Sequence, residues 1–508
     1  MSKLFNPYEL GCDFSTKNRV DGWDPDMNCP NPHLLITGQS GGGKTTLLKD
    51  IINYLGNKRN KIVFVLDIHN GMDVENENYI KYSARNTNVG INPFEFDFDT
   101  DDGGPEIRAG VLVSLFKKHF MPNAGPIQQN ILKELFIDTY KYKGIYDRDE
   151  KTWPRHEIDD ESDDMSSGTS LPTMNDLEDV YTMIFNKLNV KGEMSKAAHI
   201  SSEFSYYTTK IKEAPNERTK KKYEELLKKR TKDLETVSIT EDIENSGYQE
   251  EFTWFGSFGI DYNKYKGRNV IATLNTIGVY IRTFSNMNIF NAKKPKFNKN
   301  INRLDLSGFT NAGKPEFALF FFDLFLQRVF GKCKIKGEYN KRPPEQRKRG
   351  EKTDVFIVID ESRVVLPVGR EKDDPYHMTN KISAESRKYG LGLILASQRI
   401  LHYGDEILSN FYTKILLKTD SSDIPIANKK LRIVDKNLLT LTKYNDVAVI
   451  GRGSIYKAIH VDLFQQFKKK DPSDLNKEKI WSEKQTKGIM YDKGSFYCRT
   501  HIYICKYL

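Results

Sequence analysis

The chain has 508 residues, a formal net charge of +9, and 38% hydrophobic and 12% aromatic residues. This composition excludes a disordered chain, and the length predicts two or more structural units. The charge is compatible with a polyanionic partner but is too small for a chain of this length to establish one.

The chain lacks the marks of a secreted or membrane-spanning protein. Its first residues, MSKLFNPYELGCDF, contain no apolar signal-peptide core. The most apolar stretch, Phe317 to Phe330, includes Asp323 and Arg328 and is shorter than the ~20 residues of a membrane span. The cysteines are scattered and lack zinc-site spacing: Cys12, Cys29, Cys333, Cys498 and Cys505. We therefore expect a cytoplasmic protein in a reducing compartment.

A glycine-rich loop, GQSGGGKT, lies between the apolar run LLIT and the helical pattern TLLKDII. It matches the phosphate-loop pattern in the strand–loop–helix context that this pattern requires. Glycines let successive N–H groups turn toward a phosphate, and the helix adds the positive end of its dipole. We predict a nucleoside triphosphate site, with Lys44 on the β- and γ-phosphates and Thr45 on Mg²⁺. The predicted binding residues are Gly38, Gln39, Ser40, Gly41, Gly42, Gly43, Lys44, Thr45 and Thr46. An ordinary glycine-rich turn is the alternative.

The segments that follow predict an α/β core interrupted by helices. The apolar run at 61–70 predicts a second strand and hence a βαβ unit with a parallel sheet. Irregular chain is expected at 90–100, and helical spacing begins at Gly125. Further predicted segments, in chain order, are an acidic solvated loop at 147–170, helices at 171–188 and 216–237, strands at 269–274 and 301–309, a helix at 315–330 and a basic loop at 331–352. The helix at 171–188 has a candidate cap at Thr173 or Asn175, and we expect Gly390 to stop a helix at 380–390.

Polar groups follow two more buried strands. Asp360 and Glu361 end the run VFIVI, where Asp360 would hold the Mg²⁺ shell and Glu361 would orient or deprotonate the attacking water. Gln398 ends the run LILAS, where its amide could sense the γ-phosphate and place the water. The alternatives are that the acids only cap the next helix and that the glutamine is incidental. "TKILLKT" and "DVAVIGRG" predict further strands.

Transition-state charge also calls for a cation. We predict Arg387 as an arginine finger given to a neighbouring subunit, because its helix ends far from the chain's own phosphates. Lys388 and Arg399 are alternatives, with Arg399 closer to the site in the same chain. Arg387 could instead serve only the helix end and nearby surface acids.

Together, LLITGQSGGGKTTLLKDII, VFVLDIHNGMD, INPFEFD, RLDLSGF, VFIVIDES and SRKYGLGLILASQRI resemble the ATPase core of the HerA/FtsK superfamily over residues 30–465. The resemblance is strongest to HerA-type translocases and to the conjugation ATPases of type IV secretion. It implies a RecA-like P-loop core with a mainly parallel sheet, a helical insertion, a hexameric ring and ATP-driven movement along double-stranded DNA. It also implies Lys44 and Thr45 on ATP and Mg²⁺, Asp360 and Glu361 as the Walker B pair, Gln398 as sensor and Arg387 as finger. Asp67 and His69 match a D-x-H feature whose role stays open.

The predicted organisation follows from this resemblance. It comprises an N-terminal segment 1–30, a RecA-like core over 31–125 and 268–465, a helical insertion 126–267 and a C-terminal tail 466–508. HerA-type proteins carry an N-terminal β-barrel, but only 37 residues precede Gly38, so we expect no barrel. The candidate partner proteins are a nuclease and a protein of a defence or packaging system, although the missing barrel argues against a nuclease that docks on it. The transmembrane helices of membrane-anchored relatives are also not expected.

Three functions are compatible with these motifs. The first is an ATP-dependent double-stranded DNA translocase or helicase that contacts DNA without sequence preference. The second is a secretion or genome-packaging ATPase. The third is a nucleotide-gated scaffold of a defence or packaging complex, against which the intact Glu361 argues. Adenine is the expected base, because the sequence IANKKL lacks the aspartate of the guanine-reading N-K-x-D motif.

Overall fold

The computed structural model describes residues 8–12, 19–23, 25, 31–83, 89–97, 101, 103–154, 170–212, 220–221, 223–228, 259–261, 264–265, 269–292, 294–311, 315–339, 353–367, 372, 374, 377–431, 446–450 and 457–460. The chain forms two compact units. The first comprises Met1–Ile91 and Ala292–Leu508, and the second comprises Asn92–Asn291. The second unit extends beyond the predicted helical insertion of 126–267 on both sides.

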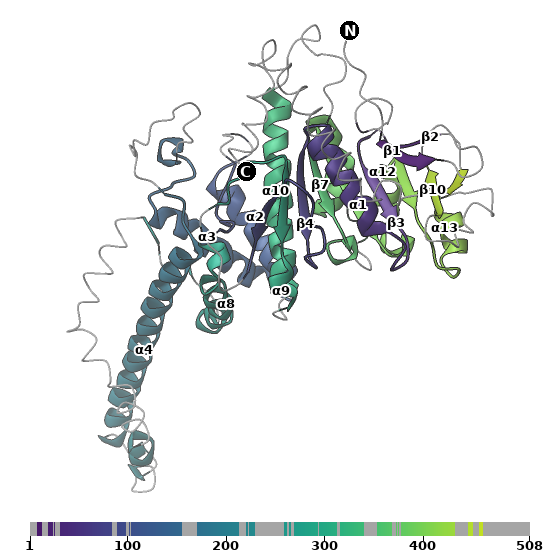
Figure 1. The fold of residues 1–508 in the computed structure, drawn as a ribbon. Coiled ribbons are helices and arrows are strands. Elements are labelled where there is room, and N and C mark those ends of the chain that lie inside the picture. Colours follow the sequence, from purple (N-terminus) through teal and green to yellow (C-terminus); the bar gives the residue numbers. More distant parts are fainter. Residues whose placement is uncertain are drawn as a thin grey trace. The chain divides into compact units, whose positions relative to one another are not determined.

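A nine-stranded sheet forms the first unit, in the order β11-β10-β9-β3-β8-β7-β4-β6-β5 (Figure 1). The seven strands from β9 to β5 are all parallel, and β10 and β11 are antiparallel. This confirms the predicted α/β core with a mainly parallel sheet. The strands are β3 (Leu34–Thr37), β4 (Ile62–Asp67), β5 (Asn78–Lys81), β6 (Ile301–Asp305), β7 (Val355–Ile359), β8 (Leu391–Ser397), β9 (Thr413–Leu416), β10 (Asp446–Ile450) and β11 (Lys457–His460).

Helices cover both faces of this sheet, which explains why its central strands are apolar throughout. In β4, Val63 and Val65 belong to the core cluster under helix α1, while the ring of Phe64 packs edge-on against Phe325 of helix α10. Successive strand residues point to opposite faces, so one apolar run supplies two cores. The helices of this unit are α1 (Lys44–Asn53), α9 (Ser307–Asn311), α10 (Pro315–Tyr339), α11 (Met378–Glu385), α12 (Asp405–Asn410) and α13 (Ile424–Leu431).

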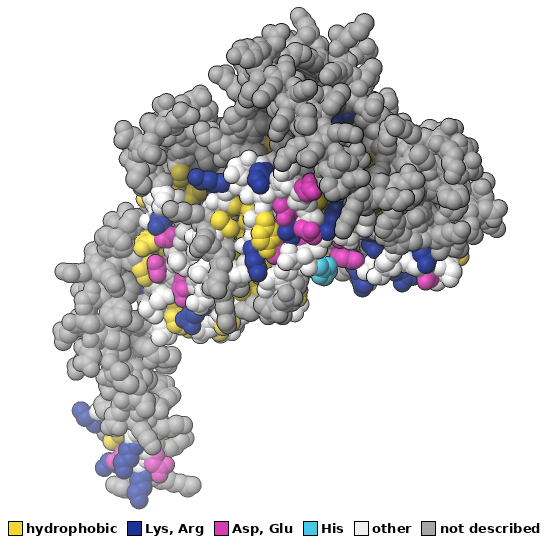
Figure 2. Space-filling view, viewed as in Figure 1, with side chains coloured by type: hydrophobic (Ala, Val, Ile, Leu, Met, Phe, Trp, Pro, Cys, Tyr) yellow, Lys and Arg dark blue, Asp and Glu magenta, His cyan; other side chains and the backbone are white. Residues whose placement is uncertain are grey.

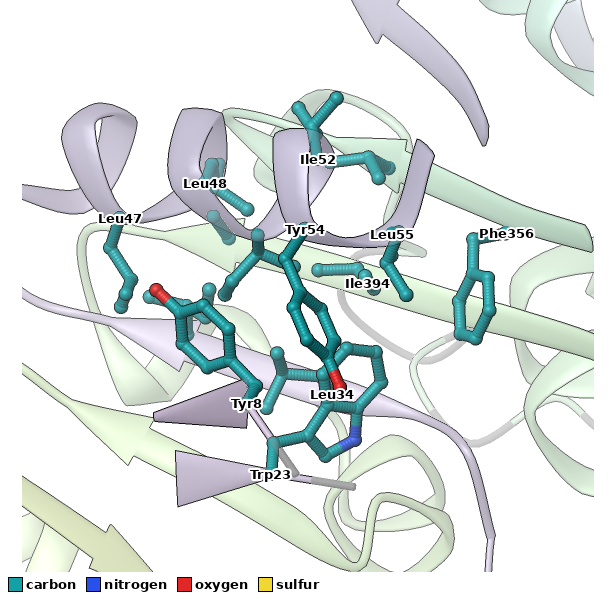
Figure 3. Packing of buried hydrophobic residues seen from close by; sticks show 14 of the residues in the cluster. Tyr8, Trp23, Leu34, Leu47, Leu48, Ile52, Tyr54, Leu55, Phe356 and Ile394 are labelled. Carbon is teal, nitrogen blue, oxygen red and sulfur yellow. The ribbon is translucent and has the colours of Figure 1, made fainter. Parts of the chain in front are cut away.

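An N-terminal hairpin, which the sequence did not predict, completes one of these cores. Strands β1 (Tyr8–Cys12) and β2 (Arg19–Trp23) pair antiparallel. Figure 3 shows Tyr8 and Trp23 inserted among the side chains of α1 and the sheet. The ring of Tyr8 lies 5.2 Å from that of Tyr54, and Trp23 lies 5.6 Å from Phe356, both edge-on. The hairpin thus covers apolar surface next to the helix that follows the phosphate loop.

The second unit is mainly helical. Its long helices are α2 (Pro105–His119), α3 (Pro126–Tyr142), α4 (Met174–Lys212) and α8 (Val270–Ser285). Thr173, one of the two candidate caps, caps α4: its N–H donates to the Asp176 carboxylate at 2.7 Å, and its hydroxyl accepts from the Asp176 N–H at 3.4 Å. The buried rings of Phe94, Phe136 and Tyr140 pack edge-on within this unit.

Three predicted elements differ from the structure. The strand expected at 301–309 ends at Asp305, and Ser307 begins helix α9. Residues 269–274 were expected to be a strand, but Val270 begins helix α8. The reason lies beyond that window, because the buried residues of α8 recur at helical spacing: Val270, Leu274, Ile277, Gly278, Ile281 and Phe284. The predicted basic loop at 331–352 is helical at its start, because α10 continues to Tyr339. The predicted stop at Gly390 is confirmed by its left-handed φ of 70° after α11 and a 3-10 turn.

Other predicted segments lie outside the described residues. These are 155–169 of the acidic loop, 229–237 of the charged helix, 340–352 of the basic segment and the tail from 466 onward. Within the described part of the chain, no helix combines the length and apolar character needed to cross a membrane.

Candidate nucleotide-binding site

The glycine-rich loop leaves β3 at the carboxyl edge of the sheet and enters α1 (Figure 1). Gly41 and Gly43 have left-handed φ angles of 73° and 93°, which explains glycine at these two positions. The loop is anchored to both neighbours of β3. Gly38 N–H donates to Ser397 O of β8 at 3.3 Å, and Gln39 N–H donates to Lys418 O beyond β9 at 2.8 Å.

Lys44 begins α1, and its side chain lies over the loop. Its Nζ donates to the Gln39 carbonyl at 3.2 Å, and the residue is buried, with 7% exposed. Burial lowers the pKa of Lys44, while the nearby Glu361 and Asp360 carboxylates oppose this shift. A buried ammonium beside a turn of glycines and a helix N-terminus is suited to an anionic ligand.

The predicted carboxylates lie opposite this loop. Thr45 Oγ1 donates to Asp360 Oδ2 at 3.2 Å, which joins the first turn of α1 to the end of β7. Burial raises the pKa of Asp360, against the opposing effect of the Glu361 N–H, which donates to its Oδ1 at 2.9 Å. Glu361 has a left-handed φ of 51°, a strained conformation for a non-glycine residue.

Gln398, the predicted sensor, contacts the second carboxylate. Gln398 Nε2 donates to Glu361 Oε1 at 2.9 Å. Strand β8 lies between β3 and β7 in the sheet. Because β8 ends next to Gln398, the predicted sensor lies between the phosphate loop and the two carboxylates.

These residues fit a nucleoside triphosphate with Mg²⁺. The loop offers flexible glycines and a buried lysine, and the close Thr45 hydroxyl and Asp360 carboxylate offer oxygen ligands of the type Mg²⁺ prefers. The described residues contain no group of three or more His, Cys, Asp or Glu suited to a metal. A magnesium ion carried in largely by phosphate and water oxygens requires no such group.

The two candidate arginines lie at different edges of the sheet. Arg387 is exposed in the 3-10 turn Ser386–Tyr389 that leads into the amino end of β8. The seven residues of β8 separate that turn from Gln398, a span of about 23 Å. Arg399 follows Gln398 directly, but its Nε and Nη2 are paired with the buried carboxylate of Asp423 at 2.5 to 3.1 Å. The structure therefore places Arg387 away from its own chain's phosphate loop.

Asp67, at the end of β4, organises the loop that follows it. Its carboxylate accepts the N–H groups of His69, Gly71 and Met72 at 3.0 to 3.2 Å, and Arg303 Nη1 at 3.2 Å. His69 itself is exposed. The aspartate of the D-x-H feature is thus occupied by its own loop and by β6.

A buried tyrosine missed by the sequence analysis lies beneath the site. Tyr403 Oη donates to Ile36 O of β3 at 3.2 Å and accepts from Ser362 Oγ, next to Glu361, at 3.4 Å. Burial raises its pKa, so the phenol stays neutral. No pattern marked Tyr403, because it follows the short 3-10 segment Ile400–His402 after β8.

Comparisons with known proteins agree with the resemblance to HerA-type ATPases. Residues 26–100 match the family model described as Helicase HerA, central domain. The DNA double-strand break repair helicase HerA of Pyrococcus furiosus is 30% identical over 100 residues, which cover 20% of this chain and 17% of that protein. Residues 26–100 thus resemble the central domain of HerA helicases. The HerA helicase of Sulfurisphaera tokodaii is 41% identical to this HerA-like chain over 76 residues, 14% of each protein.

A solved structure extends the likeness of fold to most of the HerA-like chain. VirB4 of Thermoanaerobacter pseudethanolicus superimposes with a TM-score of 0.56 at 14% identity, covering 92% of this chain and 98% of that one. The matches to the two HerA helicases, by contrast, span less than a fifth of those proteins' own length.

Proposed function

We propose that the HerA-like chain hydrolyses ATP with Mg²⁺ and uses this reaction to move double-stranded DNA through a ring of six copies. The observation that carries the proposal is one constellation. Lys44 lies over the phosphate loop, Thr45 contacts Asp360, and Gln398 contacts Glu361, all at the carboxyl edge of one parallel sheet. The groups proposed to bind phosphate, to hold the metal and to activate water therefore lie close together.

Each side chain then has a task. Lys44 and the loop N–H groups would bind the β- and γ-phosphates, while Thr45 and Asp360 would hold Mg²⁺, which neutralises phosphate charge. Glu361 would accept a proton from the attacking water. The Gln398 amide donates a hydrogen bond to Glu361 Oε1 and so orients the carboxylate before the reaction. The carboxylate must then accept hydrogen bonds from both the amide and the attacking water.

Arg387 is proposed to complete the site of a neighbouring subunit. Its exposure and its place at the opposite end of β8 support action between chains rather than within one. A guanidinium that stabilises charge on the transferred phosphoryl group raises the rate by orders of magnitude.

The DNA part of the proposal rests on the names of the HerA relatives, DNA double-strand break repair helicases, and on the net charge of +9. On the face shown in Figure 2, the described lysines and arginines are interspersed with acids rather than gathered in one stripe. We therefore expect the DNA phosphates to contact the wall of a central channel, where the modest positive charge of one chain is repeated by each subunit of the ring.

A secretion or packaging ATPase is the second candidate, supported by the VirB4 fold. The test is ATP hydrolysis by the parent and by Lys44→Ala, with and without duplex DNA over a range of salt. Translocation predicts turnover that duplex DNA stimulates, a stimulation that declines with salt, and at least a ~100-fold loss in Lys44→Ala. Lys44-dependent turnover that duplex DNA does not change would instead favour the secretion or packaging candidate.

A nucleotide-gated scaffold predicts a different result. A Glu361→Gln variant would then keep both ATP binding and biological function, because only binding would matter. If Glu361→Gln binds ATP but abolishes turnover and function, the scaffold is excluded.

A further inference from the structure

The segment that follows the sensor glutamine is tied to the segment that supports the phosphate loop. We propose that Arg399 is a positioning residue, whose ion pair with Asp423 holds Gln398 in register with the loop. This inference rests on the proposed ATP hydrolysis and adds a residue to its machinery. It also replaces the alternative from sequence that Arg399 supplies the transition-state cation in its own chain.

The pair spans the strand that carries the phosphate loop. Arg399 follows β8, and Asp423 lies beyond the end of β9, while β3 lies between these two strands. Arg399 Nε lies 2.9 and 3.1 Å from the two Asp423 oxygens, and Nη2 lies 2.5 Å from Oδ1. Only a planar guanidinium can make this forked contact, since a lysine offers a single point of attachment.

Both ends of the pair are connected to the phosphate loop. On the β8 side, the Ser397 carbonyl, one residue before Gln398, accepts from Gly38 N–H. On the β9 side, Lys418 O accepts from Gln39 N–H, and Leu417 N–H donates to Thr37 O at 2.8 Å. A Cβ on Gly38 would lie only 2.8 Å from Leu417 Cβ, so this packing admits no side chain. The loop is therefore held between the two segments that the ion pair joins.

The Arg399–Asp423 pair and the Gln398–Glu361 contact extend to opposite sides of the same backbone segment. Arg399 is extended, with φ −135° and ψ 140°, so neighbouring side chains along this stretch leave opposite sides of the backbone. Gln398 reaches Glu361 on the β7 side, and Arg399 reaches Asp423 on the β9 side. Asp423 is 2% exposed on its side chain, whereas that of Arg399 is 48% exposed. The buried carboxylate is thus the fixed end, and the arginine sets the position of the sensor backbone.

The test is a set of double-mutant cycles on ATP hydrolysis. Arg399→Lys and Asp423→Asn each remove the forked contact with little change of size. We expect each to lower kcat at least ~10-fold, because a small displacement of a catalytic group is costly, while the dissociation constant for ATP changes less than about threefold. The double variant should be no slower than either single variant. In a Gln398→Ala background, Arg399→Lys should have no further effect on kcat.

Other outcomes would overturn the inference. If Arg399→Lys abolishes turnover and Asp423→Asn leaves it unchanged, the arginine acts directly on the phosphates. If the effects of Arg399→Lys and Gln398→Ala multiply, the pair supports the fold without acting through the sensor. Glu106→Gln, which breaks the Glu106–Lys133 pair of the helical unit, is the matched control and should leave kcat unchanged. A parent without Lys44-dependent turnover would overturn the proposed function together with this inference, whereas additive variants in an active parent overturn this inference alone.

Discussion

At the scale of single residues, the site combines groups whose ionisation burial disfavours. Asp360 has a raised pKa because it is buried, and Lys44 has a lowered one for the same reason. Such shifts cost stability in the empty protein and favour a ligand that supplies the missing counter-charge. We therefore expect the burial of these two groups to lower the stability of the empty protein and to raise its affinity for the ligand.

Asp360→Asn tests this trade. A raised folded pKa contributes stability below the unfolded pKa, and that contribution is lost as the pH rises through the folded pKa. In chelator without nucleotide, the asparagine variant should therefore melt at a higher temperature than the parent at pH 8, and the difference should vanish near pH 4. With ATP and Mg²⁺ the order should reverse, because only the parent keeps the metal-holding carboxylate.

Thermal melts over this pH range, with and without ligand, provide the measurement. Asp405→Asn is the control, because Lys430 lowers the pKa of the exposed Asp405 carboxylate, and its removal should not raise the melting temperature at pH 8. A parent and an Asp360→Asn variant that melt together in chelator at pH 8 would contradict the argument.

At the scale of elements, the local sequence pattern predicted the structure correctly where a residue type has one specific structural role. The phosphate loop, the Thr173 cap and the Gly390 stop were predicted because glycine, a capping hydroxyl and a lysine each carry a specific local meaning. The window at 269–274 was misread, since Val270, Ile271 and Leu274 fit a short strand until the longer helical period is considered.

Contacts between segments that are far apart in the chain could not be predicted from the sequence. The Arg399–Asp423 pair, the Tyr403 contacts and the hairpin around Tyr8 depend on which strands are neighbours. A motif fixes the residues near it but not the strand order, and the insertion of β8 between β3 and β7 is a property of the whole sheet. Those contacts therefore had no signal in any one stretch of sequence.

Tyr8→Phe tests whether the hairpin supports the phosphate-loop helix. The Tyr8 hydroxyl donates to Asp50 Oδ2 of α1 at 2.5 Å, and both residues are largely removed from water. Deleting the hydroxyl leaves a mostly buried carboxylate without this donor, so unfolding should become easier by about 1.5 to 3 kcal/mol. Denaturant melts measure this. Tyr389→Phe is the control at a half-buried tyrosine outside the hairpin, and equal losses in the two variants would remove the special role of the Asp50 contact.

At the scale of the whole molecule, the proposed ring makes the site depend on two chains. The parts that a single chain can assemble, Lys44, Asp360, Glu361 and Gln398, converge at the carboxyl edge of its sheet. Arg387 lies before the amino end of β8, with the length of that strand between it and Gln398. A closed ring of identical subunits would repeat one heterologous interface and could bring each Arg387 to the next subunit's site.

Mixing two inactive variants tests this division of the site. Lys44→Ala and Arg387→Ala should each lose most ATP hydrolysis alone, through loss of phosphate binding and of transition-state stabilisation. In a 1:1 mixture, an Arg387→Ala subunit contributes an intact Lys44 while its Lys44→Ala neighbour contributes an intact Arg387. About a quarter of randomly formed interfaces then hold a complete site, so turnover should reappear. Lys44→Ala mixed with Gln398→Ala is the control, since Gln398 contacts Glu361 of its own chain and Lys44 shares that site. Because each complete site there needs both residues from one chain, this second mixture should stay inactive, and equal recovery in both mixtures would rule out Arg387 as the shared residue.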